Sequence, residues 1–412
     1  MLLRRVISIP VLLFTLIAIL SLLSGCQRDE TDGRYEAKNA KQYERKHTLV
    51  ASTDILLPID SVTSFDYSDI QYFTNNDTAY LALFNPNIPA LDVYNFAERS
   101  KLKRIYFALE GPDGVGNNTN NMGCFVYAPD TIIIHNYWSD KLFFLHANAK
   151  KIASIDMVPP DSLFFSAFFT QAIPFRVGNE VFFPNLYQGI KKGQLIPSQK
   201  IPVFQVTNVE KQTIRFVGKR SSVYDKDYHV AGTNSGVLGD YNPHTQKVIY
   251  SFKQDHFIYT NDINGSNVTK RYVASEFFEQ IPPLSTSFEQ GLEMQRNNRE
   301  KVREYVLTAP NYSIIKYDPW REVYYRFAYL PRTLEDYQGR AYRLRPSIII
   351  MDKNFNKTGE VKIDPDGYFN TAKLIQSFVT PQGLCIPWKN RQSEDFLTLR
   401  VFTLQKVNDS DS

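Results

Sequence analysis

The stretch Cys124–Met157 constrains the fold more than any other part of the chain. It contains four short apolar runs separated by polar segments rich in Asn, Asp, Ser and Pro: Cys124–Ala128, Ile132–Asn136, Leu142–His146 and Ile152–Met157. Such runs predict four antiparallel strands connected in order. A sheet of this kind cannot bury both faces alone, so similar sheets must pack against it.

The same combination of a polar turn followed by an apolar strand recurs six times along the chain. We interpret each recurrent strand as the third strand of its sheet, and these strands begin at Leu91, Leu142, Val203, Val248, Val323 and Phe396. Six units predict an all-β fold, a six-bladed β-propeller of four-stranded antiparallel blades with a small helical insertion. The alternative is a β-sandwich accompanied by a second domain.

Two segments are expected to be insertions, and one strand is expected to close the ring. Ser285–Arg303 is polar and compatible with a helix, whereas Pro331–Arg345 is predicted to be a charged loop. Asp54–Ile59 has no partner in the first unit. We therefore expect it to pair with the last blade, which would leave no open end in the ring.

The N-terminus has the features of a secretory signal. Arg4 and Arg5 precede the apolar run Val6–Leu23, and the sequence Leu-Ser-Gly-Cys that ends at Cys26 resembles a lipobox. This predicts a lipoprotein signal peptide over residues 1–25, lipidation of Cys26, a flexible tether over 26–47 and the propeller over 48–412. An uncleaved transmembrane anchor is the alternative, which Pro10 and the small residues before the cysteine disfavour.

One loop and one repeat resemble a known family. Glu110–Gly116, between two predicted blades, resembles the Gly- and Pro-rich loop of NHL-like and TolB-like six-bladed propellers, and Met122–Ile155 resembles a full repeat of that kind. With the lipobox, nearly the whole mature chain is similar to uncharacterised Bacteroidota lipoproteins with a six-bladed propeller, a domain-of-unknown-function family. The resemblance implies a fold and a location but no activity, so it supplies no catalytic residues.

The residues after the cysteine bear on localisation. Gln27 stands where an aspartate would retain a lipoprotein in the inner membrane, and the acidic residues Asp29, Glu30 and Asp32 resemble a signal for export to the cell surface. We therefore expect a protein anchored to the outer membrane by lipid, on the periplasmic or the exposed side. Anchoring by more than one acyl chain is stable.

Charge and cysteine positions bear on possible partners and on disulfide formation. Removal of the signal takes away two arginines and no acid, which leaves 45 basic against 43 acidic residues. This near balance gives no reason to expect nucleic acid as a partner. Cys124 and Cys385 both lie in apolar runs, so we favour buried free thiols over a disulfide.

No pattern typical of a catalytic or metal site is present in the sequence. The six histidines lack the spacing of a zinc site, and neither a nucleophile elbow nor a phosphate-binding loop occurs. Asp364-Pro365-Asp366-Gly367 resembles the start of a calcium loop, but it lacks the downstream acid and is also a favourable hairpin turn. We therefore predict no catalytic residue, no metal and no cofactor.

The three tryptophans give the sharpest hypothesis about a site. Trp138, Trp320 and Trp388 each fall at or just before an expected second-to-third-strand turn. That placement would bring them to one rim of the ring, where they could stack on a sugar. The alternative is that the aromatic residues fill gaps between blades.

We expect a monomeric, membrane-anchored lipoprotein whose propeller binds a ligand, with a glycan or a protein as candidate partner. An alternative is a propeller hydrolase or lyase acting on a glycan or lactone, which would need carboxylate, Asn or His side chains converging on the axis. A third hypothesis is a scaffold that meets a protein through the two insertions.

Overall fold

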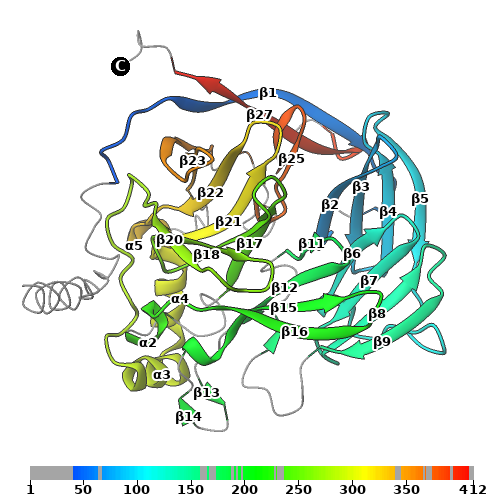
Figure 1. Cartoon of the computed structure of the whole chain (residues 1–412), viewed down its shortest axis with the longest axis horizontal. Helices are drawn as coiled ribbons and strands as arrows, with labels where there is room; N and C mark the ends of the chain where they lie inside the picture. Colours follow the sequence, from blue (N-terminus) through cyan, green and yellow to red (C-terminus); the bar gives the residue numbers. More distant parts are fainter. Residues whose placement is uncertain are drawn as a thin grey trace, which may run out of the picture.

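Six four-stranded antiparallel sheets form a ring in the computed structural model (Figure 1), which confirms the predicted six-bladed propeller. The structure describes residues 40–63, 67–157, 165–166, 173–186, 190–191, 194–195, 198–226, 229, 236–338, 345–364, 367, 374–389 and 393–407. The predicted signal peptide and Cys26 lie outside these residues.

The first three blades follow one another along the chain. Blade 1 is β2 (Asp69–Asn75), β3 (Thr78–Asn85), β4 (Ala90–Asn95) and β5 (Ser100–Tyr106). Blade 2 is β6 (Met122–Ala128), β7 (Thr131–Asn136), β8 (Lys141–His146) and β9 (Lys151–Asp156), which confirms the four predicted strands of Cys124–Met157. In blade 3 the first strand is in two pieces, β10 (Phe165–Ser166) and β11 (Phe175–Val177), followed by β12 (Glu180–Leu186), β15 (Pro202–Asn208) and β16 (Thr213–Lys219).

The other three blades complete the ring. Blade 4 is β17 (Val237–Asn242), β18 (Lys247–Phe252), β19 (Phe257–Asp262) and β20 (Thr269–Tyr272). Blade 5 is β21 (Asn311–Asp318), β22 (Val323–Tyr329), β23 (Pro346–Met351) and β24 (Lys357–Lys362). Blade 6 is β25 (Phe378–Thr380), β26 (Gly383–Trp388), β27 (Phe396–Lys406) and, from the other end of the sequence, β1 (His47–Pro58).

The ring is closed by pairing between β1 and β27, which lie side by side in Figure 1. The prediction that Asp54–Ile59 joins the last blade is confirmed, although the strand begins earlier, at His47, and ends at Pro58. Arg400 donates two hydrogen bonds of 2.8 Å to the carboxylate of Asp54. The closing strand also buries Leu57 in the interface between blades 6 and 1.

One type of hairpin turn recurs, and its position differs between blades. An Asn or Asp side chain accepts the backbone N–H groups two and three residues later, and a residue with φ between 49° and 55° ends the turn. Asn136 forms it between the second and third strands of blade 2, but Asn242 and Asp318 form it between the first and second strands of blades 4 and 5. The prediction that Val248 and Val323 begin third strands is therefore wrong, because both belong to second strands.

The long connections gather on one face of the ring. First-to-second and third-to-fourth connections within the blades are turns of two to six residues. The other face carries the hairpin of β13 (Ile190–Lys191) and β14 (Gln194–Leu195), and the helices α2 (Val223–Lys226), α3 (Phe288–Asn297), α4 (Arg299–Thr308) and α5 (Leu334–Gln338), which lie together in Figure 1. The helical insertion predicted over Ser285–Arg303 is confirmed. The predicted loop Pro331–Arg345 instead contains α5, and its residues 339–344 lie outside the described part.

Apolar clusters fill the interfaces between neighbouring blades. Both remaining cysteines belong to these clusters, Cys124 between blades 1 and 2 and Cys385 between blades 6 and 1. They are free and buried, as predicted. Burial raises the pKa of both thiols, that of Cys385 to about 12, so neither is a reactive thiolate at neutral pH.

Candidate functional site

The first strand of each blade is innermost, and these strands surround a central cavity of about 380 Å³. Neighbouring first strands contact one another around the axis, for example β17 with β21 and β2 with both β6 and β25. Every blade contributes to the lining, through residues such as Asp69, Phe125, Arg176, Asp240, Lys316 and Phe378. The volume lies within the range typical of small-molecule sites. We call this cavity the central channel.

Two polar side chains of β2 bind the backbone of the next blade. The Asp69 carboxylate accepts the N–H of Cys124 at 3.1 Å. The Gln71 side-chain amide accepts the N–H of Val126 at 2.7 Å and donates to the carbonyl of the same residue at 2.8 Å. An innermost strand has an edge without a neighbouring strand, so these bonds satisfy backbone groups that the sheet leaves unpaired.

Asp240 and Arg176 make equivalent bridges elsewhere in the ring. The Asp240 carboxylate accepts the N–H groups of Tyr241 and, in the next blade, Tyr317, both at 2.9 Å. The Arg176 guanidinium donates to the carbonyl of Tyr127 in blade 2 and lies 4.1 Å from the centre of that residue's ring. The charged groups of both side chains therefore hold neighbouring blades together.

Lys316 differs from the other charged residues of the channel. Lys316 is partly exposed, and among the described residues no partner lies within hydrogen-bond or ion-pair distance of its ammonium group. Sequence reasoning missed Lys316, Asp69, Asp240 and Arg176. The signal that could have revealed them is a charged residue within an otherwise apolar first strand, as in Ile-Ile-Lys-Tyr at 314–317.

Aromatic side chains make up much of the remaining lining. Tyr72 and Phe378 stack with ring centres 5.6 Å apart and planes 10° from parallel. Tyr241 and Tyr317 line the side of the channel nearest to Pro243 and Pro319, which belong to turns on the face with short connections. Burial raises the pKa of Tyr72 and of Tyr317, so both hydroxyls stay protonated at neutral pH.

The prediction that the three tryptophans share one rim is wrong. Trp138 follows the second strand of blade 2 and is 68% exposed, whereas Trp320 follows the first strand of blade 5. Successive antiparallel strands reverse direction, so these two turns lie on opposite faces. Trp388 is only 6% exposed and packs against Phe402 and the Arg400 guanidinium. A common tryptophan surface therefore does not form, although Trp320 is next to the channel residue Pro319.

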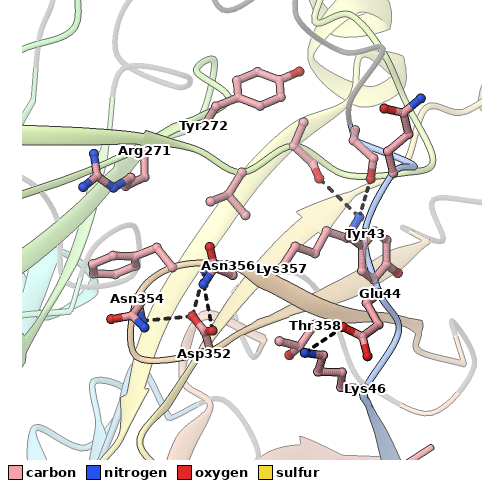
Figure 2. Close-up of a pocket in the computed structure, with 15 residues that line it drawn as sticks. Tyr43, Glu44, Lys46, Arg271, Tyr272, Asp352, Asn354, Asn356, Lys357 and Thr358 are labelled. Carbon is pink, nitrogen blue, oxygen red and sulfur yellow. Dashed lines mark hydrogen bonds and ion pairs between the residues drawn. The ribbon is translucent and has the colours of Figure 1, made fainter.

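A second cavity, of about 470 Å³, lies at the outer edge of blades 4 and 5 (Figure 2). Its walls are residues 40–46, the end of β20 and the turn between β23 and β24. In Figure 2, Arg271 and Tyr272 stand across the cavity from Tyr43 and Lys46. Because part of its wall is the segment that precedes β1, this cavity depends on how that segment is held. We call it the N-terminal groove.

A polar network that is buried at Lys357 and Glu360 and exposed at Arg45 holds residues 40–46 against the propeller. The Tyr43 hydroxyl donates to Glu276 at 2.7 Å, and Arg45 forms an ion pair with the same carboxylate at 2.8 Å. Beneath them, the Lys357 ammonium pairs with Glu360 at 2.6 Å. Burial is the main cause that raises the pKa of Tyr43 and lowers that of Lys357. The end of the predicted tether thus lies on the surface of blades 4 and 5.

Within the described ranges, no group of three or more His, Cys, Asp and Glu side chains could hold a metal ion. Residues 365 and 366 of the candidate calcium loop lie outside those ranges. Among the helices that the structure describes, none is long and apolar enough to cross a membrane.

The chain is similar to proteins of the genus Bacteroides. Residues 47–362 match the model of a family described as a domain of unknown function, DUF4221. The crystal structure of a DUF4221 member from Bacteroides vulgatus has a TM-score of 0.71 and 19% identity, over 88% of this chain and all of that one. A Bacteroides fragilis protein described as exported has a TM-score of 0.52 and 12% identity, over 89% of this chain and 99% of that one. No curated protein matches. The family match spans most of the chain, and the chain belongs to the DUF4221 family.

Proposed function

We propose that this protein is an exported, lipid-anchored protein whose propeller binds a small molecule in the central channel. The observation that carries the proposal is a cavity of about 380 Å³ to which all six innermost strands contribute. Small-molecule sites combine apolar and aromatic walls with a few placed polar groups. The channel has this composition, with Tyr72, Phe378, Tyr241 and Lys316 in its wall.

The hydrogen bonds made by the two channel carboxylates favour a binding protein over an enzyme. A hydrolase or lyase would need acids or histidines that converge on the axis and are free to act. The carboxylates of Asp69 and Asp240 instead accept backbone N–H groups of neighbouring blades. Those bonds give both side chains a role in holding the ring.

The test is a thermal-unfolding screen of the chain from residue 27 against sugars, amino acids, carboxylic acids and phosphate. A compound present at a hundred times its Kd is expected to raise the unfolding temperature by roughly 4 °C. Ile173→Trp, which adds a large side chain to the channel wall, should abolish the shift. The proposal fails if no compound stabilises the protein, or if the shifts survive in Ile173→Trp.

Lipid anchoring is supported by the lipobox and by the similarity to a protein described as exported. Cys26→Ser removes the thiol that would carry the diacylglycerol. We expect this variant to lose incorporation of a labelled fatty acid and to leave the membrane fraction, whereas Cys124→Ser should retain both. Equal labelling of Cys26→Ser and wild type would contradict lipid attachment at this residue.

A further inference from the structure

We infer that the molecule bound in the central channel carries an acidic group, a carboxylate or a phosphate, that pairs with Lys316. This inference rests on the proposed channel-binding function and specifies the chemical class of its ligand. Neither the family match nor the structural relatives assign a ligand to this position.

The register of blade 5 fixes where Lys316 lies. Lys316 pairs with Tyr325 across β21 and β22, and Ile314 is on the same face of β21 two residues earlier. Tyr325 and Ile314 are both buried in the interface between blades 5 and 6. Lys316 therefore lies on the side of β21 that faces β25, and it lines the channel together with Phe378 of that strand.

The channel wall has two negative and two positive side chains, and Lys316 is the one whose charged group has no hydrogen bond or ion pair with a described residue. Asp69 and Asp240 accept backbone N–H groups, and Arg176 donates to a backbone carbonyl while stacking on Tyr127. Among the described residues, none offers an acceptor to the Lys316 ammonium group. An ammonium group that loses water without gaining an anionic partner is unfavourable, so a ligand that fills the channel should bring that partner.

The wall beside Lys316 indicates what the acidic group is attached to. Tyr72 and Phe378 form a stacked pair, and Tyr241 and Tyr317 also line the channel. Flat aromatic faces favour a ring, either aromatic or a sugar. A ring that bears an acidic group, such as an aromatic acid or a uronic acid, satisfies both Lys316 and these side chains.

Most charged side chains of the N-terminal groove have a partner, except that the exposed Arg271 donates only to the carbonyl of Lys270, at 3.4 Å. Lys46 pairs with Glu44, and Lys357 pairs with Glu360. Asp352 accepts the N–H groups of Asn354 and Asn356 within its own turn. Because Arg271 stands in water whereas Lys316 is only partly exposed, the groove gives a weaker reason to expect an anionic ligand, although its volume of about 470 Å³ exceeds that of the channel.

The experiment is calorimetric titration of the chain from residue 27 and its Lys316 variants with two acids and their neutral counterparts. The acids are benzoate and glucuronate, and the counterparts are benzyl alcohol and glucose. At least one acid is expected to bind wild type, and Lys316→Gln should weaken it about 10- to 100-fold, as expected for loss of a charged hydrogen bond. Lys316→Arg keeps the charge and should retain most of the affinity. Thermal unfolding of each variant without ligand checks that the fold is intact.

Each outcome decides the inference. Weakening of an acid in Lys316→Gln, with recovery in Lys316→Arg, supports it, and the acid that binds shows whether the ring is aromatic or a sugar. Neutral counterparts that bind as tightly as the acids overturn the inference but leave channel binding in place. Acids that bind wild type and Lys316→Gln equally, or that do not bind at all, also overturn it. The proposed function is then judged separately by the wider screen and Ile173→Trp.

Discussion

Replacement of Glu360 by alanine is expected to lower the free energy of unfolding by about 3 to 5 kcal/mol. Glu360 is 1% exposed and is the centre of the network beneath residues 40–46. Its carboxylate accepts hydrogen bonds from the hydroxyls of Ser275 and Ser347, from the N–H of Glu276 and from the Lys357 ammonium group, at 2.6 to 2.8 Å. Loss of the carboxylate leaves the buried ammonium group without its nearest partner, which is why the effect is large.

Urea-induced unfolding of the chain from residue 27 measures this difference. Glu44→Ala is the matched control. Glu44 pairs with Lys46 at the surface, and 77% of the Glu44 side chain is exposed. That change should cost less than about 1 kcal/mol. The double variant Glu360→Gln with Lys357→Met removes both charges, and its free energy of unfolding should be closer to wild type than that of Glu360→Ala. A Glu360→Ala protein that unfolds at the wild-type urea concentration would contradict the role given to this network.

Replacement of Leu57 by alanine is expected to destabilise the protein by about 3 kcal/mol, within the range measured for buried Leu-to-Ala changes. Leu57 is fully buried where the closing strand β1 packs between blades 6 and 1. The cavity left by the missing side chain would weaken the contact that joins the two ends of the chain into a ring.

The neighbouring residue provides the control for this second variant. Leu56 is 38% exposed on the same strand, so Leu56→Ala should change the unfolding free energy by less than about 0.5 kcal/mol. Denaturant unfolding of both variants gives the comparison. Equal effects of the two changes would mean that β1 does not pack against blade 1 in solution.

The blades and the closure of the ring could be predicted from the sequence, because both depend on local patterns. The strands of blade 2 follow from alternating apolar runs and turn residues, and the unpartnered run at Asp54 indicated the closing strand. The order of strands in blades 4 and 5 could not be predicted in this way. A turn of the type begun by Asn242 or Asp318 can connect any two consecutive antiparallel strands. Its sequence therefore does not distinguish a first-to-second from a second-to-third connection.

The parts that sequence reasoning missed depend on contacts between distant residues. Tyr43 and Arg45 look like part of a polar tether, but their partner Glu276 is more than 230 positions away. Likewise, the Asp240 carboxylate reaches Tyr317, which lies 77 residues later. Lys316 is distinctive only once β21 is known to be an innermost strand, because a lysine on an outer strand would face water.

A crystal structure of the chain from residue 27, soaked with the compound that gives the largest thermal shift, tests the location of the site most directly. We predict density for the compound inside the ring, in contact with first strands of several blades and beside the ammonium group of Lys316. Density confined to the N-terminal groove of Figure 2 or to the outer surface of the blades would contradict the central channel as the binding site.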